Sequence, residues 1–180
     1  MSDTLITIIA IFLAAILMFI FPLMSVSERN DDIAQTVVQT ATSDFVDDIA
    51  TSGAIKASSY EAYQSKIQAT GNTYDIEIEV QHLDENPGKK ATATSGNLIG
   101  ENVRYSTYTT EIMDKMYENE TDPTKENVYK LKKGDNVIVT VKNTNKTIAQ
   151  MLRTFFYKIT GQGTYQVAAS ASSMVVNNGK

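Results

Sequence analysis

The chain has 180 residues, a formal net charge of −5, one histidine and no cysteine. The negative charge and scattered basic residues argue against nucleic-acid binding, which depends on clustered lysine and arginine side chains that neutralise phosphates. The lack of cysteine excludes disulfides, thiolate metal sites and cysteine nucleophiles, and a single histidine leaves little scope for zinc sites or catalytic triads.

Residues 1–24 are predicted to form a transmembrane helix. The twenty residues from Leu5 to Met24 carry no charge, and Thr7 is the only polar side chain among them. At roughly 1.5 Å of rise per residue they match a hydrocarbon core of roughly 30 Å. The short N-terminal tail has an acid and no basic residue, which favours an uncleaved anchor, although Ser25–Ser27 leaves signal-peptide cleavage open as an alternative.

The orientation of this anchor is predicted from composition. Only Arg29 lies near an end of the span as a basic residue, so the positive-inside rule is not decisive. A four-residue tail can stay in the cytoplasm while a large domain rich in threonine and asparagine is exported. We therefore expect a single-pass protein of the cell membrane with a cytoplasmic N-terminus and an extracytoplasmic C-terminal domain.

Residues 25–53 are predicted to continue the same helix as an amphipathic stalk. Pro22 is expected to bend the helix near the membrane surface, because an interior proline removes one backbone hydrogen bond. Beyond it, apolar residues recur every four positions, and Asp31 and other acids occupy much of the rest. Gly53 is expected to end the helix. The predicted packing face consists of Ile33, Val37, Ala41, Phe45 and Ile49.

Residues 54–180 are predicted to form a small α+β domain with an antiparallel sheet and two or three short helices. Alternation of apolar and acidic residues from Tyr74 to Val80 is typical of a strand with one buried face. Ser58 and Glu61 have the spacing of a capping box that would start a helix. The other expected elements are a helix within 107–119, strands at 128–131 and 136–141 joined by a turn, a helix capped by Thr144 or Asn145 that contains Ile148 and Phe155 and ends at Gly161, and a strand from 165 to 176.

No set of residues predicts an active site. Glu77 and Glu79 share a strand face with Asp75 and could hold a hard cation, but a solvated strand face is the favoured interpretation. His82 is expected at the surface. Two pairs of tyrosines, Tyr60 with Tyr63 and Tyr105 with Tyr108, are expected to serve packing and not ligand binding. We therefore predict a protein without a cofactor and without enzymatic activity.

The overall layout resembles the type IV pilins and pseudopilins, which have an apolar N-terminal helix, an amphipathic extension and a small C-terminal α+β domain. Two segments are similar to TadE-like pseudopilins of Gram-positive bacteria. These are the stalk Thr36–Ile55 (TVVQTATSDFVDDIATSGAI) and the strand Thr73–Val80 (TYDIEIEV). The chain departs from the family in lacking a prepilin processing motif, and Leu5 stands where a glutamate would be expected.

The resemblance implies a structural subunit of a surface pilus or secretion apparatus, present in the membrane and in an extracellular filament. Its partners would be the lipid bilayer, other pilin-like subunits, an assembly ATPase and a platform protein. The small side chains of Ala10, Ala14 and Ala15 would let neighbouring helices approach closely within lipid. The alternative is a single-pass binding or adhesion domain that is displayed at the surface and does not polymerise.

Overall fold

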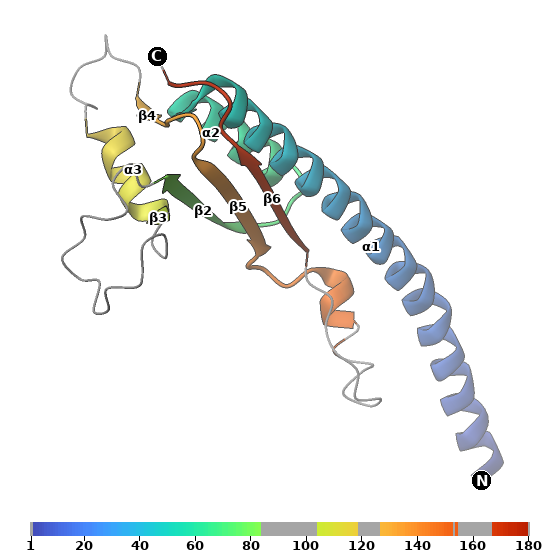
Figure 1. The fold of residues 1–180 in the computed structure, drawn as a ribbon. Coiled ribbons are helices and arrows are strands. Elements are labelled where there is room, and N and C mark those ends of the chain that lie inside the picture. Colours follow the sequence, from blue (N-terminus) through green and yellow to red (C-terminus); the bar gives the residue numbers. More distant parts are fainter. Residues whose placement is uncertain (1, 84–103, 119–126, 153, 155–166, 180) are drawn as a thin grey trace, which may run out of the picture.

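The computed structural model describes residues 2–83, 104–118, 127–152, 154 and 167–179, and within them the chain is α+β, as predicted. A single long helix precedes antiparallel strands and short helices (Figure 1). A further short helix includes residues 148–152 and 154. The elements in chain order are α1 (Ser2–Ser52), β1 (Ala54–Lys56), α2 (Ala57–Gln68), β2 (Tyr74–Leu83), β3 (Arg104–Tyr108), α3 (Thr109–Tyr117), β4 (Val128–Lys130), β5 (Asn136–Asn143) and β6 (Ala168–Met174).

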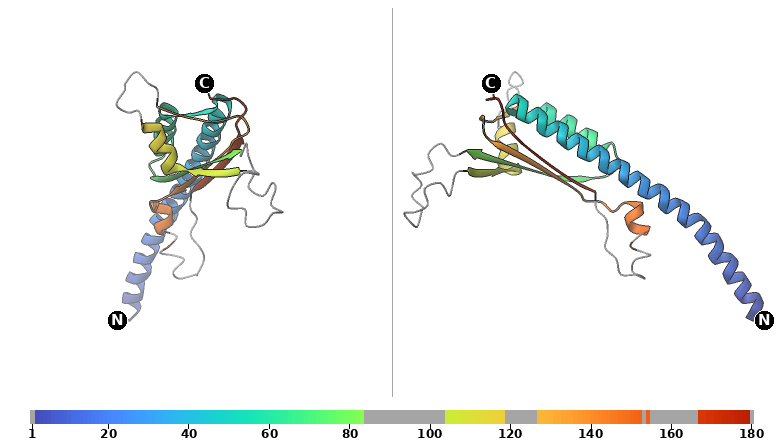
Figure 2. Two further views of the ribbon diagram at one scale, coloured as in Figure 1. Left: turned by 60° about the vertical axis from the view of Figure 1, so that its left-hand side comes forward. Right: turned by 45° about the vertical axis from the view of Figure 1, so that its right-hand side comes forward.

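Helix α1 is continuous over 51 residues, so it is roughly 76 Å long. It passes through Pro22 without a break, and its curvature is spread along the helix (Figure 2). The predicted bend is therefore gradual and is not confined to the turn that contains Pro22 (Figure 2). One missing hydrogen bond leaves the bonds of the turns on either side in place, and these hold the helix together.

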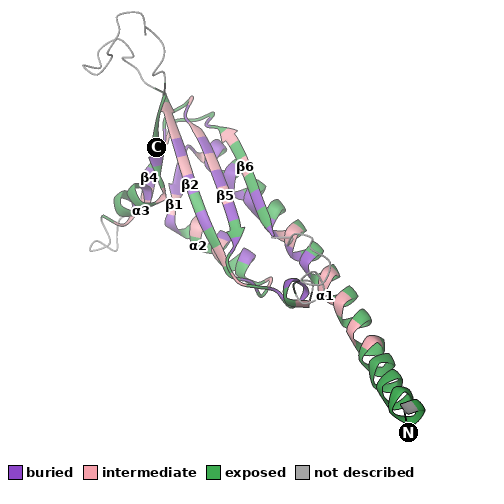
Figure 3. Cartoon of the chain, turned by 90° about the horizontal axis from the view of Figure 1, so that it is seen from below, coloured by how far each residue is buried: buried purple, intermediate pink, exposed green. Residues whose placement is uncertain are grey.

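The four-stranded sheet has the order β3-β2-β5-β6, and every neighbouring pair is antiparallel. Its register aligns apolar residues across the strands: Ile78 lies opposite Val139, and Val139 lies opposite Ala171. One face of the sheet is therefore apolar and buried, and the other carries the polar residues (Figure 3). This arrangement confirms the strand pattern predicted between Tyr74 and Val80.

Helices α1, α2 and α3 contribute to a single hydrophobic core with the apolar face of the sheet. The ring of Phe45 in α1 stacks on the ring of Tyr63 in α2, with 4.5 Å between ring centroids. Ile67 of α2 and Ile112 of α3 are fully buried in the same cluster. The C-terminal half of α1 is thus an integral part of the domain, and no structural boundary separates it from the residues after Gly53.

Two short strands pair in a way that the sequence does not predict. The predicted turn joins β4 and β5. The sequence predicts no partner for β4, which pairs with β1 in a second, two-stranded sheet. The capping box predicted at Ser58 and Glu61 does not form, because α2 begins at Ala57 and has Lys56 at its N-cap. The Ala57 amide donates to the carbonyl of Asn127 instead, so tertiary pairing replaces the local cap.

The C-terminal tail closes the end of α1. The Val176 amide donates to the carbonyl of Ala50 at 2.9 Å, and the Asn177 side-chain amide donates to the carbonyl of Thr51 at 2.8 Å. These two carbonyls belong to the last turn of α1, where no partner exists within the helix. Gly53 ends the helix as predicted, with a positive φ of 72°. The polar tail therefore completes the fold and is not merely a solvated extension.

Burial of Tyr63 predicts a loss of stability at alkaline pH. Burial raises the pKa of its hydroxyl to about 12, and the hydrogen bond with Thr42 offsets only part of this rise. The folded protein therefore retains a proton that the unfolded chain loses above about pH 10. The resulting stabilisation is complete below that pH and is lost as the pH rises toward 12.

We expect the free energy of unfolding to fall more steeply between pH 10 and pH 12 in the parent than in Tyr63→Phe, measured by urea denaturation at a series of pH values. The variant keeps the aromatic ring stacked on Phe45 and removes only the titrating hydroxyl. Parallel profiles for the two proteins would contradict this assignment.

Candidate membrane anchor and assembly helix

The N-terminal half of α1 is not covered by the domain (Figure 3). Its most apolar 18-residue window has a mean hydropathy of 2.9, and none of that window is buried. Leu5 is 61% exposed and Phe12 is 70% exposed, and Ala10, Ala14, Ala15 and Pro22 are exposed as well. Each large apolar side chain left in water forfeits about 1.5–3 kcal/mol of burial free energy. One N-terminal helix is therefore long and apolar enough to cross a membrane.

The structure divides the predicted packing face of the stalk into two parts. Ala41, Phe45 and Ile49 are buried within the domain of the same chain. Ile33 is 58% exposed, and Val37 is only partly buried. The prediction that all five residues form one face is therefore wrong. Of the five, Ile33 and Val37 remain available for contacts with another molecule.

The helical repeat explains this division. Each residue turns the helix by about 100°, so a four-residue step overshoots a full turn by about 40°. From Ile49 back to Ile33 the overshoot accumulates to about 160°, which places Ile33 almost opposite Ile49. The buried face follows alternating steps of three and four residues instead. It comprises Asp31, Ala34, Val38, Ala41, Thr42, Phe45, Val46, Ile49 and Ala50.

Asp31 is on the buried side of α1, at the same angular position as Ile49. The sequence pattern predicts it on the solvated side instead. Asp31 is 4% exposed, and its carboxylate accepts a hydrogen bond of 2.8 Å from the hydroxyl of Thr147. Thr147 also caps the short helix 148–152, because its hydroxyl accepts from the Gln150 amide while the Gln150 side chain accepts from the Thr147 amide. Thr147 is thus the capping residue, in place of Thr144 or Asn145.

This polar contact ties the stalk to the end of the domain from which the bare half of α1 extends (Figure 1). The sequence contains a signal that could have predicted the burial of Asp31. Asp31 stands 18 residues before Ile49, which is five full turns, so both side chains lie on the same side of the helix. Phe155 and the predicted helix end at Gly161 lie outside the described residues.

A shallow groove borders the exposed part of the stalk. It lies between α1 and the end of α2, and the apolar side chains of Ile33, Val37 and Ala69 line it. Lys66 is at its rim and makes an ion pair of 2.9 Å with Asp44. This groove shares Asn30 and Thr70 with a second groove, which reaches Leu23 and Val26 of α1 at the end of the predicted span.

The acidic residues of β2 lie on the polar face of the sheet. Glu77 makes an ion pair of 3.4 Å with Lys142, and Glu79 accepts a hydrogen bond of 2.7 Å from the hydroxyl of Ser106. Among the described residues, no three acidic or histidine side chains are placed to hold one metal ion. The arrangement fits a solvated strand face whose acids are paired with neighbouring strands.

His82 is partly buried, with its side chain 13% exposed, and lies in a hydrogen-bonded network. Its Nδ1 is 2.9 Å from the carboxylate of Asp135, and its Nε2 is 3.0 Å from the hydroxyl of Tyr129. Asp135 is 1% exposed and also accepts hydrogen bonds from the amides of Leu83 and Lys132, so it organises the turn before β5. Burial raises the pKa of Tyr129, which disfavours a phenolate nucleophile. These contacts give the network a structural role.

Tyr60, Tyr63, Tyr105 and Tyr108, all within the described residues, do not combine into one aromatic platform. Tyr105 packs against His82 at 5.0 Å between ring centroids, whereas Tyr108 is three residues further along β3 and lies opposite Glu79. Side chains at that spacing on a strand point to opposite faces. Tyr63 is buried, and Tyr60 packs partly against the core.

No family model, curated protein or solved structure matches this chain. The functional argument therefore depends on the geometry of α1 and the surfaces around it.

Proposed function

We propose that this chain is a membrane-anchored, pilin-like structural subunit of a surface pilus or secretion apparatus, which assembles through its N-terminal helix. The observation that carries this proposal is the continuity of α1. One helix contains a bare apolar half and a half that is part of the domain core. A contact made by the bare half is therefore transmitted to the domain without a flexible joint.

Assembly would exchange lipid contacts for contacts between neighbouring helices. Moving the apolar span through water would expose all its large side chains, so the exchange must take place directly from the bilayer. Ala10 and Ala14 are one turn apart and would allow two helix backbones to approach closely. Outside lipid, Ile33 and Val37 would provide a separate contact, because their side chains are only partly covered by their own domain. By the helical repeat, Ile33 lies about 100–140° around α1 from Ala14 and Ala10.

The proposed topology has a cytoplasmic N-terminus and an extracytoplasmic domain. An assembly ATPase and a platform protein are proposed as partners from the resemblance to pseudopilins. The polar side chains of the open sheet face have hydrogen-bonding and ionic partners within the sheet, which supports a structural subunit over an enzyme. A single-pass binding domain that does not polymerise is the competing function.

A charge at Ile33 tests the proposal. We expect Ile33→Asp to reduce the yield of cross-linked multimers in membranes several-fold, because a carboxylate buried between subunits lacks a partner. The free energy of unfolding of its domain should lie within about 0.5 kcal/mol of that of the parent, since Ile33 is exposed in the isolated chain. The measurement is amine cross-linking in native membranes, together with urea denaturation in detergent.

Gln39→Asp is the matched control, because Gln39 is exposed on α1 about 120° around the helix from Ile33 and receives the same charge. It should cross-link like the parent. Multimers of Ile33→Asp at the parental level would remove this face from the proposed assembly. A chain that is monomeric in every form would favour the non-polymerising binding domain.

A further inference from the structure

The short helix that begins at residue 148 exposes two apolar side chains in its first turn. Ile148 is 55% exposed and Met151 is 52% exposed, while Thr154 is an exposed polar residue further along the helix. The inward positions of the first turn carry Ala149 and Gln150, which are buried. A helix at the surface of a water-soluble domain normally has polar residues outside. The outward face of this turn is therefore suited to an apolar or interfacial environment.

The position of this helix identifies that environment. It lies beside α1, at the end of the sheet from which the bare half of α1 extends (Figure 1). Ile148 and Ala149 line one groove together with Leu23 and Val26 of α1. Leu23 belongs to the last turn of the apolar span, and Val26 is 67% exposed just beyond it. The short helix is thus at the level where the span leaves the hydrocarbon.

The depth of the short helix can be compared with the dimensions of a bilayer. The headgroup region adds about 5–7 Å on each side of the hydrocarbon core, which corresponds to about four residues of α-helix. If the hydrocarbon ends at Met24, the headgroup region extends to about Glu28. The groove that contains Ile148 is bordered by α1 residues from Leu23 to Asp31. The groove therefore overlaps the headgroup region between Met24 and Glu28, and it continues beyond that region to Asp31, which Thr147 contacts.

We propose that the helix 148–152 is an interfacial contact, which places its Ile148–Met151 face in the headgroup region of the bilayer. This inference rests on the proposed membrane anchoring of α1. The occupant of the apolar face is lipid, because the face is continuous with the surface of α1 that lipid already covers. Apolar side chains of an amphipathic helix bind at this depth by burying their surface between headgroups and acyl chains.

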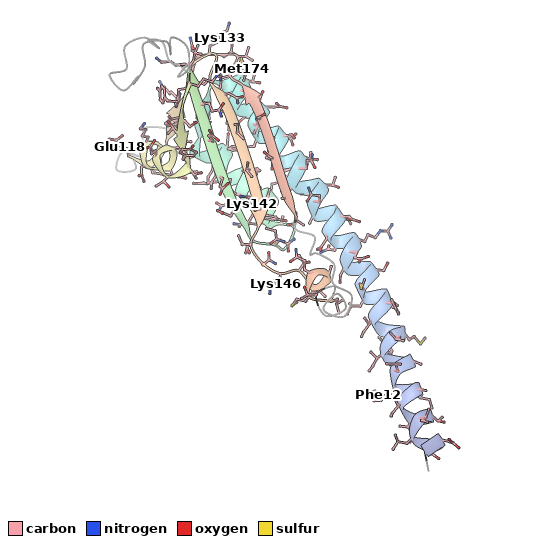
Figure 4. All side chains as sticks on the ribbon, turned by 60° about the horizontal axis from the view of Figure 1, so that its bottom comes forward. Phe12, Glu118, Lys133, Lys142, Lys146 and Met174 are labelled. Atoms are coloured by element: carbon pink, nitrogen blue, oxygen red, sulfur yellow. The ribbon has the colours of Figure 1, made fainter. Side chains whose placement is uncertain are left out.

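The internal contacts of the chain hold the helix in this position. Thr147 caps it and bonds to Asp31 on α1, so its first residue is fixed relative to the span. Lys146 is exposed immediately before the helix and can reach lipid phosphates (Figure 4). With two attachments to one bilayer, α1 and the short helix, the tilt of the domain over the membrane is restricted.

Single cysteines test the contact, because the chain has none of its own. The probe is a bimane label on Met151→Cys in the full chain, reconstituted in phosphatidylcholine vesicles that contain lipids with a nitroxide on the headgroup or at carbon 5. Met174→Cys is the matched control, since Met174 is 55% exposed and lies at the opposite end of the sheet (Figure 4). We expect several-fold stronger quenching at position 151 than at position 174.

A third label separates this inference from the anchoring on which it depends. Phe12→Cys should be quenched most strongly by lipids with the nitroxide deep in the acyl chain, because Phe12 is near the middle of the span. Deep quenching at position 12 combined with equal, weak quenching at positions 151 and 174 would overturn the interfacial contact alone. Absence of quenching at position 12 would overturn the anchoring and the contact together. Met151→Asp should retain deep quenching at position 12 and abolish the quenching of a label at Ile148→Cys.

Discussion

Phe45→Asp is expected to unfold the domain, although Phe45 lies on the same helix as the bare apolar half. Its side chain is 4% exposed and stacks on Tyr63 in the core. Truncating a buried phenylalanine costs about 3–5 kcal/mol, and an unpaired buried carboxylate adds to that cost. The expected loss of about 4 kcal/mol or more is a large part of the stability of about 5–15 kcal/mol typical of a domain. Urea denaturation followed by near-ultraviolet circular dichroism measures it.

The control for this variant is again Gln39→Asp, which places the same charge on an exposed position of the same helix. Its free energy of unfolding should stay within about 0.5 kcal/mol of the parent. Loss of multimers in Phe45→Asp therefore carries no information about the subunit interface, because the domain itself is lost. A folded Phe45→Asp domain that only fails to assemble would show that the core is packed differently from the structure described.

Gly53→Ala is expected to be the most damaging of the glycine substitutions. Gly53 has a φ of 72°, and a β-carbon there would lie 2.7 Å from the amide nitrogen of Gly179 and 2.8 Å from the carbonyl carbon of Asn178. Alanine would therefore introduce both backbone strain and a collision with the C-terminal tail, with an expected cost of about 3 kcal/mol or more. Thermal or urea unfolding of the full chain in detergent measures the loss.

Gly71→Ala separates the two contributions. Gly71 has a φ of 81°, similar to that of Gly53, but no atom lies within 4 Å of the position of its β-carbon. It should cost only the backbone strain, about 1 kcal/mol. Removal of residues 177–180 should bring the cost of Gly53→Ala close to that of Gly71→Ala. Equal costs in the intact chain would mean that the tail does not close α1.

Local patterns in the sequence predict several elements because the causes of those elements are local. An uninterrupted apolar run needs an environment other than water, so the bare half of α1 is evident from composition alone. The alternation from Tyr74 to Val80 specifies a half-buried strand, since side chains on a strand point to opposite faces with a period of two. Gly53 ends α1 because the left-handed conformation there favours glycine.

Features that depend on contacts between distant residues are not evident from such patterns. The three-residue strand β1 has no recognisable pattern of its own and exists because β4 pairs with it. Lys56 precedes α2 for the same reason, in place of the capping box at Ser58. The role of Val176 and Asn177 in closing α1 requires that the tail return to a helix end more than 120 residues earlier.

The sequence by itself determined that this protein has an apolar helix long enough for a bilayer, continued by an amphipathic one into an α+β domain. Only the tertiary structure decided which side of that helix the domain covers. The choice depends on how α1 is rotated against β5, β6 and α2, because the same helix offers apolar side chains over much of its circumference. That rotation buries Asp31 and Phe45 and leaves Ile33 exposed.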